Sequence, residues 1–261
     1  MAMFQKKTPL EKEWQILNKK EKKYLEKRAE KKDSKLNSFL EDKVPAKLQS
    51  SLDAAFEKAF STIFEKGTVM IEKTYQKEKK EKRYIVNNFA DEVEQSRKTL
   101  KAFSKEAQSA GNQNLLVSGV AGIGMGLAGV GLPDIPIFTG MIFRSIYEIA
   151  MSYGFSYDTE EEQYFILKII EGAVSYGETA VKINGEIDYF AADPVLPDGY
   201  DKKAQSKKAA AALSKELLYM KFLQGIPLVG AVGGAYDVIY MKSISEYAQL
   251  KYQKRFLLSR R

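Results

Sequence analysis

The sequence predicts an all-α protein, a multi-helix bundle with a buried glycine-rich helical hairpin. Apolar residues recur at spacings of three and four along most of the 261 residues, as they do on the buried faces of helices. No segment shows the strict apolar and polar alternation of a half-buried strand. Pro9, Pro45 and Gly67 stand where helices are expected to begin or end.

The first predicted helix runs from Leu10 to about Lys32 and is dense in Glu and Lys. A narrow apolar stripe on it predicts a peripheral helix; its members are Trp14, Leu17, Tyr24 and Leu25. The stretch "KDSKLNSF" after it resembles a break. We therefore predict a Lys/Glu-rich helical arm over residues 1–40 and a helical domain over residues 41–261.

The next segments carry a wider apolar face. A helix is predicted from Pro45 to Lys66, with Gly67 as its C-terminal stop. Residues 68–82 are helical by pattern but polar from Gln76 onwards. A long helix is then predicted from about Tyr84 to Gln108, with four residues turned inward: Phe89, Val93, Leu100 and Phe103.

The second half of the chain contains clear signals for helix starts and loops. Asp158 and Thr159 precede three glutamates, an arrangement typical of a helix start because the N-terminal dipole favours negative charge. Residues 192–201, "ADPVLPDGYD", form the clearest loop. Two helices separated around residues 224–230 are predicted between Lys202 and Leu258.

A glycine-rich stretch begins at Gly119 and ends at Gly131, within 27 uncharged residues from Ala107 to Pro133. The letters of a dinucleotide-binding turn occur in it, but a polar segment precedes them instead of a strand, and no Gly-Lys-Ser/Thr follows. We therefore reject a phosphate-binding loop. The favoured interpretation is a tightly packed helical hairpin inside the protein, because small residues let helix backbones approach closely.

Insertion of residues 107–147 into lipid is the alternative. The uncharged run reaches the roughly 20 residues needed for a span. It is poor in Leu, Ile and Phe, however, and the apolar run after it carries Arg144 and Glu148. Each charge near the centre of a span costs about 2.5–3.5 kcal/mol, which disfavours a membrane hairpin.

Positive charge is concentrated in the first part of the chain. The net charge is +7, and residues 1–105 hold 26 Lys/Arg against 17 Asp/Glu, while residues 106–261 hold 15 against 17. This skew favours an anionic partner, such as a membrane surface. The lysines alternate with glutamates and accompany no known nucleic-acid motif, so we expect no nucleic acid partner.

The sequence contains no cysteine and no histidine. Disulfides, thiolate nucleophiles and histidine general bases are therefore excluded, together with Cys or His zinc ligands. We expect no cofactor and no metal site, and we favour a non-enzymatic protein. The N-terminal residues lack the apolar core of a signal peptide, so a cytoplasmic protein is expected.

Two sets of residues are candidates for function. Charges inside or beside the apolar runs are candidates for a ligand site or for a carboxylate enzyme: Asp134, Arg144, Glu148, Asp237, Lys242 and Glu246. The same residues also have a structural explanation: Arg144–Glu148 and Lys242–Glu246 are spaced as ion pairs within a helix, and Asp134 is placed as a helix cap. Candidates for a membrane surface, aided by the basic tail "KYQKRFLLSRR", are Trp14, Lys19, Lys20, Lys22, Lys23, Lys27 and Arg28.

Several stretches, among them "LPDIPIF", "RSIYEIAMSYGF" and "IPLVGAVGGAYD", resemble the EcsC protein family of bacteria. The resemblance covers the chain from about residue 50 to the C-terminal helix. It implies a helical cytoplasmic protein linked by gene neighbourhood to an ABC transporter, and it implies no catalytic residue. The expected function is that of an accessory or adaptor protein on the inner membrane surface, with a membrane protein as a possible partner.

Overall fold

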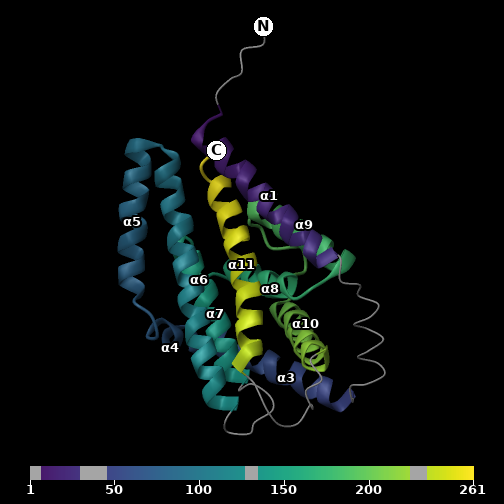
Figure 1. The fold of residues 1–261 in the computed structure, drawn as a ribbon. Coiled ribbons are helices and arrows are strands. Elements are labelled where there is room, and N and C mark those ends of the chain that lie inside the picture. The colour runs from purple at the N-terminus through teal and green to yellow at the C-terminus, as the bar shows by residue number, and fades with distance from the viewer. Residues whose placement is uncertain (1–6, 30–45, 127–134, 224–233) are drawn as a thin grey trace.

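The computed structural model describes residues 7–29, 46–126, 135–223 and 234–261, and all regular elements in these ranges are helical (Figure 1). The helices are α1 (Pro9–Ala29), α3 (Ala46–Thr62), α4 (Thr68–Glu72), α5 (Lys77–Glu94), α6 (Arg97–Gly126), α7 (Ile135–Ser152), α8 (Glu160–Ala173), α9 (Gly177–Ala192), α10 (Lys202–Leu223) and α11 (Gly234–Leu258). The predicted all-α bundle is confirmed. Residues 127–134, where the predicted glycine-rich hairpin would turn, lie outside the described residues, so the hairpin stays a prediction.

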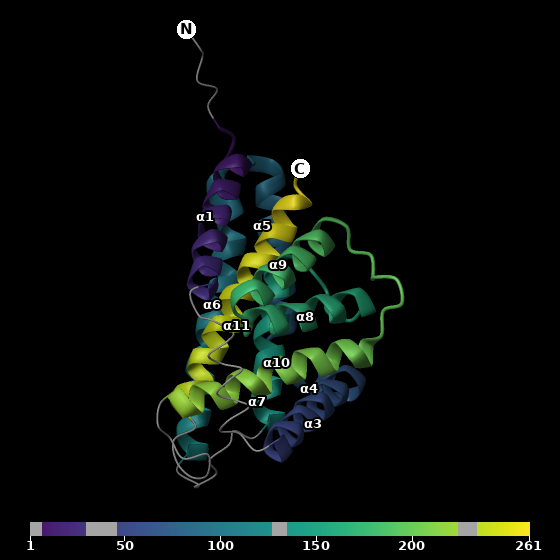
Figure 2. The same cartoon turned by 90° about the vertical axis from the view of Figure 1, so that its right-hand side faces the viewer.

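The last helix, α11, organises the bundle because it packs on α1, α6, α7, α8 and α9. In Figure 2, α8 and α10 run across the upright α6 and α11, and α3 packs beneath α10. The core is one continuous cluster rich in aromatic rings. Fully buried rings in it include Phe103, Phe143, Tyr147, Phe165 and Tyr252.

The second predicted helix is correct in its apolar face but not in its end. Leu52, Phe56 and Phe60 are buried as predicted. Gly67, however, is not a helix stop: α3 passes through a single π-helical turn, Ile63–Gly67, directly into α4. Gly67 keeps a right-handed helical backbone, so nothing at this position terminates the helix.

The helix predicted over residues 84–108 is broken in the structure. Gln95 adopts a left-handed conformation with φ of 46° and ends α5. The Ser96 hydroxyl then accepts hydrogen bonds from the amides of Lys98 and Thr99, both at 3.2 Å, and so caps the start of α6. The serine cap outweighs the continuous apolar pattern on which the prediction relied.

The prediction that Phe89 and Val93 face inward is also wrong. Both side chains are about 70% exposed on α5, whereas Leu100 and Phe103 on α6 are buried as predicted. α5 lies on the outside of the bundle against α6 and α7 (Figure 1). Its contacts with them come from the opposite side of the helix.

The N-terminal helix α1 is docked along the bundle, against α6, α9 and α11. Leu17 is buried, and the ring of Tyr24 stacks on Tyr247 with centroids 5.1 Å apart. The two ends of the described chain meet here, because the guanidinium of Arg261 lies 4.3 Å from the Trp14 ring.

The predicted start of α8 is confirmed, since the Thr159 side chain accepts a hydrogen bond from the Glu162 amide. The loop after α9 is also confirmed. Among the helices of the described ranges, none combines the length and the apolar character that a membrane span needs.

Candidate functional site

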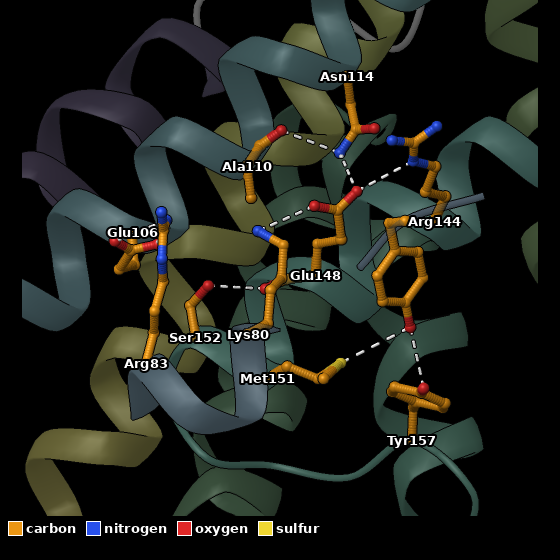
Figure 3. Close-up of polar contacts among 11 residues, drawn as sticks. Lys80, Arg83, Glu106, Ala110, Asn114, Arg144, Glu148, Met151, Ser152 and Tyr157 are labelled. Carbon is orange, nitrogen blue, oxygen red and sulfur yellow. Dashed lines mark hydrogen bonds and ion pairs between the residues drawn. The ribbon is translucent and has the colours of Figure 1, made fainter. Parts of the chain in front are cut away.

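A buried carboxylate joins three helices at the outer side of the bundle (Figure 3). Glu148 on α7 is 2% exposed. Its Oε1 atom accepts hydrogen bonds from Arg144 Nε at 3.0 Å and from Asn114 Nδ2 at 3.1 Å. Its Oε2 atom lies 2.9 Å from Lys80 Nζ, which reaches in from α5. The cluster therefore links α5, α6 and α7.

Arg144 and Glu148, which the sequence places four residues apart, do form an ion pair. Glu148 has two further partners, Lys80 and Asn114, which the sequence did not indicate. Lys80 and Asn114 are separated from Glu148 by long stretches of chain, and no local sequence pattern marks them. Both carboxylate oxygens are engaged by donors, and two cations compensate one buried anion. This geometry suits a structural junction, because a buried charge is tolerated when it is paired and hydrogen-bonded.

A second polar cluster lies nearby, built on three tyrosines. The Tyr157 hydroxyl donates to Glu72 Oε1 at 2.6 Å and lies 2.9 Å from the Tyr75 hydroxyl. The Tyr147 ring stacks on Tyr157 with centroids 4.0 Å apart. Lys77 Nζ completes the cluster at 2.6 Å from the same glutamate oxygen.

The protonation of this second cluster follows from burial and hydrogen bonding. Burial raises the pKa of Tyr157, and its hydrogen bond to Glu72 raises that pKa further. Burial alone would raise the pKa of Glu72, but the hydrogen bonds from Lys77 and Tyr157 lower it overall. Tyr157 therefore remains a neutral donor, and Glu72 remains an anion.

A cavity of about 380 Å³ opens beside this cluster, between α5 and the turn after α7. Its lining includes Lys77, Tyr84, Met151, Phe155 and Tyr157. The polar groups that reach it from Lys77 and Tyr157 are already paired with Glu72. Glu81, Ser156 and Asp158 complete the polar part of the lining, and aromatic and apolar side chains form the rest.

The remaining candidates for a ligand site do not join these clusters. Lys242 and Glu246 are exposed on α11. Asp134 and the side chain of Asp237 lie outside the described residues. Within the described ranges, no three acidic side chains converge as a metal site requires.

A model of the EcsC protein family matches residues 11–257. This chain belongs to the EcsC family. The matched range begins within α1 and ends within the last turn of α11, so it includes both polar clusters. Neither a search of curated proteins nor a search of solved structures gives a match to the chain.

The membrane-surface candidates of this EcsC protein separate into two groups on α1. Five lysines are exposed on its outer side: Lys19, Lys20, Lys22, Lys23 and Lys27. Trp14 and Arg28 are partly buried against the bundle. Arg28 donates to the Ser243 hydroxyl, and its guanidinium lies 4.6 Å from the Tyr176 ring.

Three of the five basic residues in the C-terminal tail of the EcsC chain are turned inward, whereas Arg261 at its end is exposed. Lys251 is completely buried and pairs with Glu21 and Asp188. Lys254 contacts the same two carboxylates, at 2.7 and 2.6 Å. Arg255 pairs with Glu162. These three cations hold the first half of the tail inside the bundle because each has an internal anionic partner.

Proposed function

We propose that this EcsC protein is a non-enzymatic accessory or adaptor protein that attaches to the cytoplasmic surface of a membrane, with an ABC transporter as a candidate partner. The observation that carries the proposal is the sorting of charge around α1. The sequence of α1 mixes lysines with glutamates. In the structure, two of the glutamates face the bundle, whereas most of the lysines face outward.

Two of the glutamates are turned inward and paired. Glu13 is buried, and its Oε1 atom lies 2.6 Å from Arg97 Nε on α6. Glu21 is also buried and contacts Lys251 and Lys254 on α11. With these carboxylates compensated inside, the five exposed lysines dominate the outer side of α1, where Glu11 and Glu26 remain.

The outer side of α1 suits an anionic leaflet. A lysine close to such a surface contributes about 1 kcal/mol, or roughly a fivefold gain in affinity, and the attraction falls off within a Debye length of about 8 Å. Five lysines on one side are therefore enough for reversible attachment. The apolar residues Leu17 and Tyr24 pack on the bundle, so we expect electrostatic attachment without deep insertion.

The test is flotation of the full chain with phosphatidylglycerol-containing vesicles and with neutral vesicles, at low and high salt. We expect binding to the anionic vesicles alone and release by salt. Replacing the five exposed lysines of α1 with glutamine should reduce the partition coefficient by at least two orders of magnitude, at about fivefold per lysine.

The matched control carries the same number of Lys→Gln changes at exposed positions on other helices: Lys101, Lys182, Lys203, Lys207 and Lys208. It lowers the net charge equally, so it should bind nearly as well as the natural chain if α1 is the contact. Equal loss in both variants would mean that overall charge, not α1, drives attachment. Absence of flotation under every condition would overturn the proposal.

A further inference from the structure

The outer side of α5 carries an exposed apolar row. Ile85, Val86, Phe89 and Val93 are each 64–71% exposed. Their spacing of one, four and eight residues from Ile85 places them on one face of the helix. Large exposed side chains that are grouped in this way are typical of an interaction surface.

The inner side of α5 is polar, which is the reverse of an ordinary surface helix. Lys80 pairs with Glu148, as described above, and Asp91 is the buried residue of this helix. Asp91 accepts a hydrogen bond from Thr99 at 2.6 Å and lies 3.4 Å from Arg260 Nη1. Tyr84 supplies the aromatic contact to the bundle, against Phe103. The apolar row is therefore mostly uncovered by its own chain, and of its members Ile85 reaches the cavity described above.

Charge is distributed unevenly along the exposed side of α5. Before the apolar row, Lys79, Lys82 and Arg83 are exposed beside Glu78 and Glu81, so these charges sum to +1, and Lys82 Nζ lies 3.9 Å from Glu78 of the same helix. At the end of the row, Glu92 and Glu94 sum to −2. A uniformly anionic membrane would attract the first half of the helix only weakly and would repel the second half. A partner helix with the same distribution, running in the opposite direction, would place opposite charges together at both ends.

We propose that α5 is a self-association surface, on which the apolar row of one chain packs antiparallel against the same row of a second copy. A two-fold axis between Val86 and Phe89 places the valine of each copy against the phenylalanine of the other. The same register brings Lys82 of each copy close to Glu92 of the other. A parallel pair would set Lys82 against Lys82, so the charge pattern selects the antiparallel arrangement.

The interface is small, because α5 is 18 residues long and presents one face. A helix of that length spans about 27 Å. We therefore expect a reversible dimer with a dissociation constant in the micromolar range, at the weak end of specific interfaces. The surface is separate from the lysines of α1, so this proposal stands whether or not the chain binds membranes.

The first test is sedimentation equilibrium of the full chain over a concentration series up to about 100 µM, a range suited to weak interfaces. The natural chain should move from monomer to dimer. Phe89→Glu should raise the dissociation constant of the dimer at least tenfold, because it places a charge in the apolar row. Val181→Glu, at a 55% exposed position on α9, should leave dimerisation unchanged.

A charge-reversal pair tests the antiparallel register. Lys82→Glu alone should weaken the dimer, and addition of Glu92→Lys to the same chain should restore it, because opposite charges then face each other again. A natural chain that stays monomeric throughout would overturn the proposal. So would loss of vesicle flotation in Phe89→Glu without a change in sedimentation, which would assign the row to lipid.

Discussion

The helices α5 and α7 have the same length, 18 residues, and lie side by side, but they are held in opposite ways. α7 buries twelve side chains, including Ile142, Phe143 and Ile146. α5 buries Asp91 alone and rests on ion pairs, hydrogen bonds and the Tyr84 ring. Hydrophobic burial therefore fixes α7, whereas polar contacts position α5. The comparison separates the part of the bundle that supplies stability from the part that presents a surface.

The largest expected contrast comes from one phenylalanine on each helix. Phe143→Ala should lower the free energy of unfolding by about 4 kcal/mol, because it leaves a cavity in the aromatic core. Phe89→Ala should change it by less than about 0.5 kcal/mol, because that side chain is exposed. Urea denaturation, at a dilution that keeps the chain monomeric, measures both. Similar losses in the two variants would contradict the comparison.

The junction between the two helices is the next point to test. Glu148→Gln should destabilise the protein by about 3 kcal/mol, because Lys80 and Arg144 would lose the carboxylate that compensates them. Glu246→Gln is the matched control, at an exposed position on α11. Its cost should stay below about 0.5 kcal/mol. Equal unfolding midpoints for Glu148→Gln and the natural chain would remove the structural role assigned to this cluster.

A smaller effect is expected at the turn after α7, where Gly154 has φ of 82°. A Cβ atom there would lie 2.2 Å from the ring of Tyr84, which holds α5. Gly154→Ala should therefore cost about 2 kcal/mol and increase amide exchange along α5. In the control, Gly199→Ala, φ is also positive but the site has open space. Backbone strain alone should act there, and exchange on α5 should stay unchanged.

Patterns in the sequence correctly predicted those features that depend on residues close together in the chain. The apolar face of α3 and the Thr159 cap of α8 both follow from residues close together in the chain. The stripe on α5 was recognised too, but it was assigned to the wrong side. An amphipathic pattern shows that a helix has an apolar face, and it does not show what covers that face.

The partners that decide the orientation of α5 and α1 are distant in sequence. Arg260, which contacts Asp91 on α5, belongs to the C-terminal end of the chain. Glu21 on α1 is compensated by Lys251 and Lys254 on α11. Such pairs depend on the tertiary fold, so neither the inward turn of the α1 glutamates nor Lys80 at Glu148 could be predicted.

The polar inner face of α5 also affects how the protein responds to temperature. Release of α7 would expose a large apolar area, with the large heat capacity change that makes hydrophobic stabilisation weaken on cooling. Release of α5 would uncover mainly charged and amide groups, whose hydration changes the heat capacity in the opposite direction. We therefore expect the free energy that holds α5 on the folded bundle to vary with temperature differently from the free energy that holds the core together.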